Sequence, residues 1–153
     1  DGWPIFGPGA RIRDYVFGAR DRIDDTPDRV RTVRDARFKY IRNFMSHVSH
    51  AQPSQYKDGK KILQTIRALH AEGKLNDVQA RPFAPRRPPE ELYDLRRDPH
   101  QLTNIADQPA YAATLAQLRA RVRTWMTETH DPRLDPKYDA CDHFPYYGKP
   151  TQR

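Results

Sequence analysis

Proline recurs along the whole of this chain and limits the length of any helix or strand. There are 14 prolines in 153 residues, whereas average usage is about 5%. Proline breaks a helix interior and removes a donor from a sheet, so this spacing excludes a coiled coil or a protein built on one long helix. No segment approaches the roughly 18–20 apolar residues that a membrane-spanning helix needs.

The composition between these prolines is that of a folded but polar chain. Apolar residues make up 37% and aromatic residues 10%, which is too many aromatics for a typical disordered tail. The length fits one domain, and the low apolar fraction indicates a core that something else completes. The single cysteine, Cys141, cannot form an internal disulfide, so we expect a free or intermolecularly paired thiol.

Several segments have the β-branched and aromatic composition of strands. They are residues 15–19, 29–34, 38–44 and 91–95, with the short link 35–37 forming a hairpin loop. The charged segment 20–28 is too rich in aspartate and proline to continue the first strand. We therefore expect this segment to leave the sheet as a loop.

Two segments have the three-and-four apolar spacing of amphipathic helices. One begins near Asp58 and ends at Gly73, a suitable C-terminal cap, and the other runs from about 108 to 129. The apolar stripe of the second helix consists of Leu115, Leu118, Val122, Trp125 and Met126. Between them, the proline-rich residues 80–89 are expected to be extended. This order predicts an α+β fold: a small antiparallel sheet of about four strands with the long C-terminal helix packed on one face.

The familiar catalytic and nucleotide-binding motifs are absent from the sequence. It contains no GxSxG, GxGxxG, Walker loop, HExxH or paired CxxC. Its six histidines lack the spacing of a metal site on a helix face, so we predict no metal site in this chain. Basic residues are spread out and interleaved with acids, which argues against nucleic-acid binding. The net charge of +7 favours an acidic glycan as the polyanionic partner.

The sharpest local feature is the run of alternating charges at residues 20–25 (RDRIDD). Arg20 and Arg22 present planar forks suited to bidentate binding of sulfate, phosphate or carboxylate. Asp21 and Asp24 are suited to orienting these arginines or binding sugar hydroxyls. A solvated salt-bridge cluster is the alternative interpretation of the same residues.

Three blocks of the sequence resemble the sulfatase family. Residues 91–106 (ELYDLRRDPHQLTNIA) are similar to the ELYDL…DPxExxNxA signature near the end of sulfatases. Residues 15–24 (YVFGARDRID) resemble the YVFxARDRxD segment, and residues 125–132 (WMTETHDP) resemble the ending of the heparan N-sulfatase (sulfamidase) branch. The resemblance covers about residues 12–132, with a variable insert at about 46–88.

The resemblance implies a sulfatase C-terminal subdomain at residues 14–132, between an irregular lead-in (1–13) and an irregular tail (133–153). In such enzymes a larger N-terminal domain carries the calcium ligands and a formylglycine nucleophile, made from Cys or Ser in a C/S-x-P-x-R motif. Cys141 lacks the following Pro and Arg, so it is not that nucleophile. We therefore expect calcium and formylglycine in a missing catalytic domain, and no catalytic residue in this chain.

The resemblance also places residues 20–24 at the rim of the substrate cleft. It implies that Arg20 and Arg22 contact a sulfated or carboxylated sugar, with Asp21 and Asp24 orienting them or binding hydroxyls. Family members commonly occur in the periplasm, in lysosomes or outside the cell. The predicted function is the C-terminal portion of a sulfatase that hydrolyses sulfate esters or sulfamates of glycans, with no hydrolase activity by itself.

Two alternatives remain from the sequence. One is a stand-alone polyanion-binding module that uses Arg29, Arg31, Arg34 and the basic face of the last helix. The other is a structural subunit that pairs with a separate catalytic chain.

Overall fold

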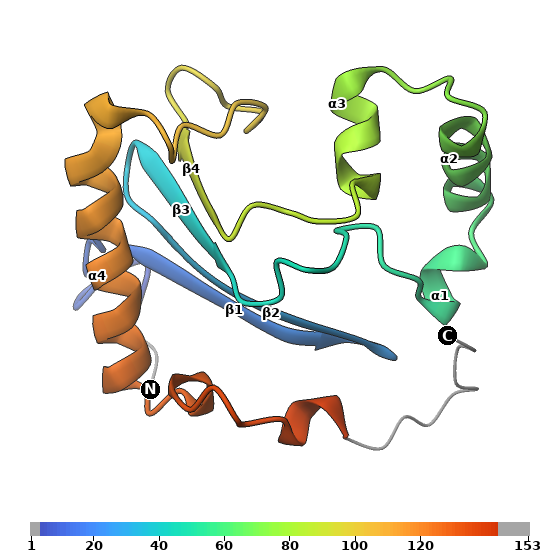
Figure 1. Ribbon diagram of the computed structural model, residues 1–153. Helices are drawn as coiled ribbons and strands as arrows, with labels where there is room; N and C mark the ends of the chain where they lie inside the picture. Colours follow the sequence, from blue (N-terminus) through green and yellow to red (C-terminus); the bar gives the residue numbers. More distant parts are fainter. Residues whose placement is uncertain (1–3, 144–153) are drawn as a thin grey trace.

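The computed structural model describes residues 4–143, without the side chain of Cys141, and shows a four-stranded antiparallel sheet with helices (Figure 1). The strands are β1 (Val16–Ile23), β2 (Thr26–Arg34), β3 (Phe38–Asn43) and β4 (Glu90–Asp94), in the order β1-β2-β3-β4. The helices are α1 (Gln55–Asp58), α2 (Lys61–Ala71), α3 (Asp77–Ala80) and α4 (Ala112–Glu128). The predicted α+β class is confirmed. The prediction for the Cys141 thiol lies outside what the structure describes, as do the ends of the two irregular segments.

The first hairpin is longer than the sequence predicted. The expectation that residues 20–28 leave the sheet is wrong: β1 continues to Ile23 and β2 begins at Thr26. Asp24, with φ of 50°, and Asp25 form the tight turn between them, and aspartate tolerates this left-handed conformation better than most residues. The charges stay in the sheet because most of them have partners on one face or the other.

The β1–β2 ladder is irregular at one place, opposite Asp21. Arg20 pairs with Val30 and Arg22 pairs with Pro27, so the register shifts between the two arginines. Two residues of β2, Asp28 and Arg29, therefore lie opposite Asp21 alone, which is a β-bulge in β2. Asp21 itself follows the ordinary alternation of β1 and faces the side of the sheet opposite to Arg20.

The 17-residue helix α4 covers one face of the sheet and makes the core. Val33, Tyr40 and Leu92 of the sheet are buried against the helix. The helix contributes Leu118, Val122 and Met126 from the predicted apolar stripe, while Leu115 and Trp125 are half-buried at its edge. Each fully buried side chain of this size contributes about 1.5–3 kcal/mol.

The insert between β3 and β4 forms a separate lobe of short helices, away from α4 (Figure 1). The helix predicted from about Asp58 to Gly73 corresponds to α2, which starts at Lys61, and a separate short helix, α1, precedes it and ends at Asp58. Gly73, with φ of 65°, follows α2, and the next amide, at position 74, bonds back to the carbonyl of Leu69 at 2.9 Å. No residue of α1, α2 or α3 is fully buried.

The proline-rich segment returns the chain from this lobe to the sheet. Its first part, Arg81–Phe83, is a turn of 3₁₀ helix rather than extended chain. The rest runs beside the end of β3, where the Asn43 amide N–H donates to the Pro89 carbonyl at 2.9 Å. Among the described residues no helix is long and apolar enough to cross a membrane.

Candidate functional site

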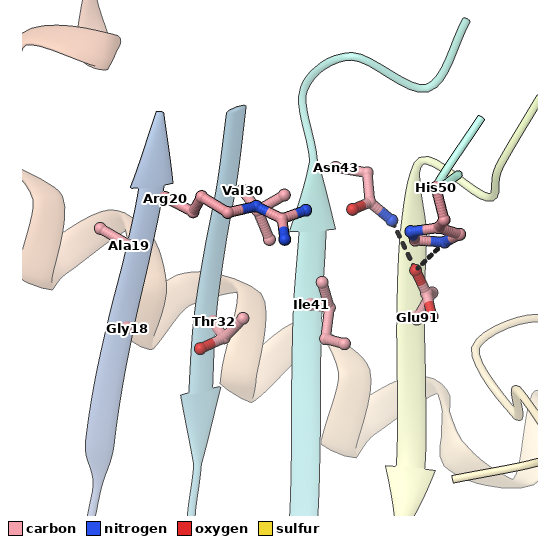
Figure 2. A pocket seen from close by; sticks show the side chains of 9 residues that line it. All are labelled: Gly18, Ala19, Arg20, Val30, Thr32, Ile41, Asn43, His50 and Glu91. Carbon is pink, nitrogen blue, oxygen red and sulfur yellow. Dashed lines mark hydrogen bonds and ion pairs between the residues drawn. The ribbon is translucent and has the colours of Figure 1, made fainter. Parts of the chain in front are cut away.

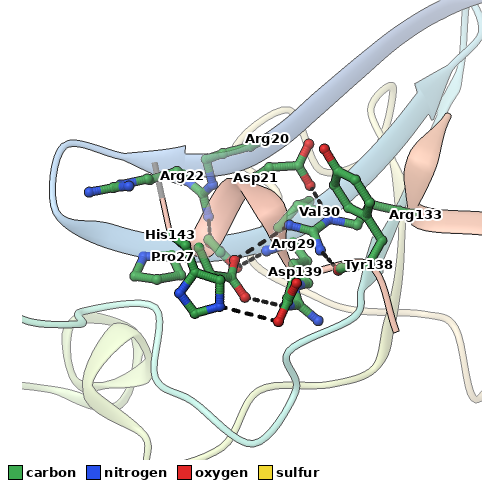
Figure 3. Close-up of polar contacts among 12 residues, drawn as sticks. Arg20, Asp21, Arg22, Pro27, Arg29, Val30, Arg133, Tyr138, Asp139 and His143 are labelled. Atoms are coloured by element: carbon green, nitrogen blue, oxygen red, sulfur yellow. Dashed lines mark hydrogen bonds and ion pairs between the residues drawn. The ribbon is translucent and has the colours of Figure 1, made fainter. Parts of the chain in front are cut away.

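The four predicted site residues lie on one hairpin but do not converge on one point. Figure 3 shows three of them, Arg20, Asp21 and Arg22. Arg20 is on the sheet face away from α4, where its guanidinium bonds to the carboxylate of Asp28. Arg22 donates from Nε to the backbone carbonyl of Asp24 in the turn, at 2.5 Å. Asp21, the neighbour of Arg20 on β1, faces the other side of the sheet.

Asp21 belongs to a buried ionic network beside the end of α4. One of its carboxylate oxygens accepts from Arg31 Nη2 at 3.0 Å and the other from Arg133 Nε at 2.9 Å. The Arg31 guanidinium, only 2% exposed, also binds Asp131, with Nη2–Oδ1 at 2.9 Å. The hydrogen bonds from Arg31 hold the pKa of Asp131 below its usual range in spite of burial. This geometry gives Asp21 a structural role.

Arg20 belongs to a second ionic cluster, on the opposite face of the sheet. Its partner Asp28 is buried and also receives Arg87 Nη1 at 3.1 Å and the Arg29 amide at 2.8 Å. Burial by itself raises the pKa of Asp28, but the hydrogen bonds from Arg87 and the charge of Arg20 outweigh it and lower the pKa. Two arginines on one carboxylate leave this cluster with a net positive charge.

A hollow of about 310 Å³ lies on this open face of the sheet, beside Arg20 (Figure 2). Its floor is formed by Gly18, Val30, Thr32 and Ile41. A Cβ on Gly18 would come within 2.9 Å of the Thr32 hydroxyl oxygen, so a side chain there would need Thr32 to move. The floor is apolar and the charged groups stand at the rim.

His50 stands at the rim and also lines a neighbouring hollow of about 460 Å³. Burial lowers the pKa of His50, which keeps the imidazole neutral at neutral pH. Its Nε2 atom lies 3.8 Å from Glu91 Oε1, which also accepts from Asn43 Nδ2 at 2.6 Å. Tyr93 donates to the other oxygen of Glu91. These contacts hold the Glu91 carboxylate in place.

The second hollow is basic. Arg81, Arg86 and Arg87 line it together with Tyr93 and Asn104. Arg86 is exposed, and no described residue forms an ion pair with it. A planar guanidinium at the edge of a hollow is suited to binding a sulfate or a carboxylate in bidentate fashion.

Sequence patterns predicted Arg20 for this candidate site but not His50, Arg86 or Arg87. The last two belong to the proline-rich segment, whose Arg86-Arg87 doublet is the one local signal that could have indicated a basic surface. Nothing local indicates that residues 50 and 86–87 meet the first hairpin, because the insert brings them there.

The chemistry that this arrangement supports is binding. The described residues include no group of three or more His, Cys, Asp or Glu side chains placed to hold a metal ion. The rim carries guanidinium groups, a neutral imidazole and amides, which recognise anionic oxygens and hydroxyls.

Comparisons with known proteins identify the relatives of this chain. No family model matches it. It is 40% identical over 140 residues to an ulvan-active sulfatase of Formosa agariphila, a match that covers 92% of this chain and 23% of the relative. It is also 50% identical over 42 residues to human N-sulphoglucosamine sulphohydrolase, covering 28% of this chain and 8% of the relative.

The chain matches the C-terminal region of sulfatases. It spans about a quarter of the length of the two curated sulfatases that it matches over most of its own length. The solved structure of a 2-O GAG sulfatase has the same fold, with a TM-score of 0.51 at 21% identity, over 93% of this chain and 24% of that one. The resemblance seen in the sequence is confirmed.

Proposed function

We propose that this chain forms part of the wall of the substrate cleft in a sulfatase that acts on sulfated glycans. The observation that carries the proposal is the 40% identity to an ulvan-active sulfatase over nearly the whole chain. Human N-sulphoglucosamine sulphohydrolase and a Delta 4,5-hexuronate-2-O-sulfatase of Bacteroides thetaiotaomicron, two further matches, also carry names that refer to sugars. Sulfated sugars are therefore the substrate class that the relatives favour.

Hydrolysis itself belongs, in this proposal, to a catalytic domain outside this chain. That domain would supply the formylglycine nucleophile and the calcium ion expected for the family. Within the part of the chain that the structure describes, no three or more His, Cys, Asp or Glu side chains are grouped so as to hold a metal ion. The role proposed for this chain is to bind and orient the sugar.

Arg20 and Arg22 are proposed to meet the sulfate or carboxylate groups of the glycan, with Arg86 on the neighbouring hollow. Asp24, at the turn, is placed to accept from a sugar hydroxyl. Asp21 acts indirectly, because its carboxylate holds Arg31 and Arg133 and so fixes the strand that carries Arg20.

A stand-alone polyanion-binding module is less compatible with these contacts. Arg31 is buried between two carboxylates, and Arg29 is paired with Asp142. Of the three hairpin arginines in that hypothesis, Arg34 is the exposed one. Heparin binding that survives the loss of Arg20 and Arg22 but fails when Arg29 and Arg34 are changed would favour the module.

The proposal is tested by kinetics of the complete enzyme with Arg86→Gln and, separately, Arg20→Gln. We expect kcat/KM for a sulfated oligosaccharide to fall about tenfold or more, because a charge-assisted hydrogen bond is lost. The rate with a small aryl sulfate, which does not reach the wall, should be unchanged. Arg34→Gln is the matched control. Unchanged turnover of the oligosaccharide, or an equal loss with both substrates, would contradict the proposal.

A further inference from the structure

Another basic hollow lies on the side of the sheet opposite to the two hollows around His50, between α4 and the end of β3. We call it the α4 groove; its volume is about 560 Å³. Tyr40, Val122 and Met126 form its base. The polar and aromatic groups at its mouth are Arg42, Phe44, Glu90, Arg119 and Arg123.

One carboxylate, that of Glu90, holds Arg119 in a fixed position and lies near Arg42. Arg119 binds Glu90 through two parallel bonds, Nε to Oε1 and Nη2 to Oε2, each at 2.7 Å. Arg42 Nη1 lies 3.8 Å from the same Oε1, and the Tyr40 hydroxyl donates to it at 2.5 Å. The bonds from Arg119 lower the pKa of Glu90, so this residue is ionised at neutral pH. Its single charge balances only one guanidinium.

Arg123 and Phe44 complete the mouth of the groove. Arg123 follows Arg119 by one helical turn, so both lie on one side of α4. Arg123 is exposed and forms no ion pair with any residue of the described part of the chain. The Phe44 ring is 38% exposed, with the Arg42 guanidinium carbon 5.5 Å from its centroid.

We propose that the α4 groove is a second site for a sulfated sugar unit. Arg42 and Arg123 bind the sulfate, and Phe44 contacts the apolar face of the sugar ring. Arg42 Nη1, 3.8 Å from Glu90 Oε1, is too far away for a hydrogen bond to it, so the guanidinium can still bind a sulfate in bidentate fashion. The choice of a sulfated sugar rests on the proposed function, whereas the excess positive charge is a property of the groove itself.

The test is an NMR titration of the full chain with a heparin tetrasaccharide at low ionic strength. The amide signals of Phe44 and Arg123 report on this groove separately from the hollows around His50. We expect saturable shifts at both amides. Arg123→Gln and Arg42→Gln should each weaken the binding about tenfold or more. The matched control is Arg121→Gln, which removes the same charge from the same helix but faces Tyr15 and should change the affinity less than about twofold.

Further titrations, with another variant and other ligands, distinguish a sugar-binding site from general attraction between charges. Phe44→Leu should weaken binding of the tetrasaccharide but not of inorganic sulfate, and neutral chitotetraose should not bind. The absence of saturable shifts, or equal losses with Arg121→Gln and Arg123→Gln, would overturn the proposal. Failure here leaves the kinetics of the Arg20 and Arg86 variants unaffected, so the two proposals can fail separately.

Discussion

Arg31 shows how much a single residue of this chain depends on partners far away in the sequence. Its guanidinium is buried between Asp21 and Asp131, and the second of these lies 100 residues along the chain. Breaking a buried pair by removing one partner leaves an uncompensated charge in the interior. We therefore expect disruption of this network to lower the stability of the fold by more than its formation contributes.

Replacing Arg31 by alanine should destabilise the fold by about 3–5 kcal/mol, because two carboxylates then lose their shared cation. Urea unfolding measures this. The control is Arg34→Ala, an exposed arginine of the same strand, which should stay within about 0.5 kcal/mol of the parent. Similar losses for both variants would mean that burial of the ion pairs is unimportant.

The same network predicts a dependence of stability on pH. The hydrogen bonds from Arg31 lower the pKa of Asp131 in the folded state, whereas in the unfolded chain it lies near the usual value of about 3.9. The unfolded state thus takes up the proton first, and stability is lost as the pH falls below about 4 through the folded pKa. Asp131→Asn should flatten this part of the curve of unfolding free energy against pH. An unchanged slope would contradict the assignment.

At the scale of elements, local sequence patterns correctly predicted the features that depend on nearby residues. The stripe on α4, the 35–37 hairpin loop and the glycine after α2 followed from spacing and turn chemistry. The length of the first hairpin did not, because its charged residues are stabilised by Asp131, Arg133 and Arg87. Strand propensity disfavours charged residues in a sheet, but here ion pairs with distant residues stabilise them in the strands.

The contact between α4 and the sheet should respond strongly to truncation of its central residue. Leu118 is 1% exposed and packs in the cluster with Tyr40 and Leu92. Leu118→Ala should cost about 2–5 kcal/mol, as expected when a buried side chain leaves a cavity. Leu102→Ala, at a position 41% exposed, is the control and should cost far less. Thermal unfolding of the two variants measures these losses of stability. Equal losses would argue against the packing of α4 on the sheet as the main part of the core.

At the scale of the molecule, the segment after α4 links the end of the described chain to the first hairpin through ion pairs. Asp131 and Arg133 bond to Arg31 and Asp21, and Asp142 pairs with Arg29. The candidate site is likewise assembled from separate parts of the chain, since the first hairpin, the insert and the proline-rich segment each supply a portion of its rim. Sequence patterns predicted Arg20 as a residue of this candidate site but did not indicate His50 and Arg86, because contacts between distant parts of the chain bring these two residues there.

Removing residues 131–153 should therefore destabilise the whole fold, by about 3 kcal/mol or more, because Arg31 loses a buried carboxylate. A chain that ends at residue 143 keeps every contact named above and serves as the matched control. Denaturant unfolding of both forms checks the prediction. If the chain without residues 131–153 were as stable as the chain that ends at residue 143, this segment would not be part of the cooperative fold.

The central proposal is that this chain is the C-terminal portion of a sulfatase that acts on glycans, and the chain matches about a quarter of its relatives' length. The most direct test is to determine the coding sequence immediately upstream of the codon for Asp1. We predict a continuous reading frame that encodes a catalytic domain with a C/S-x-P-x-R motif. A stop codon in that frame, with no such region joined to this chain, would contradict the claim.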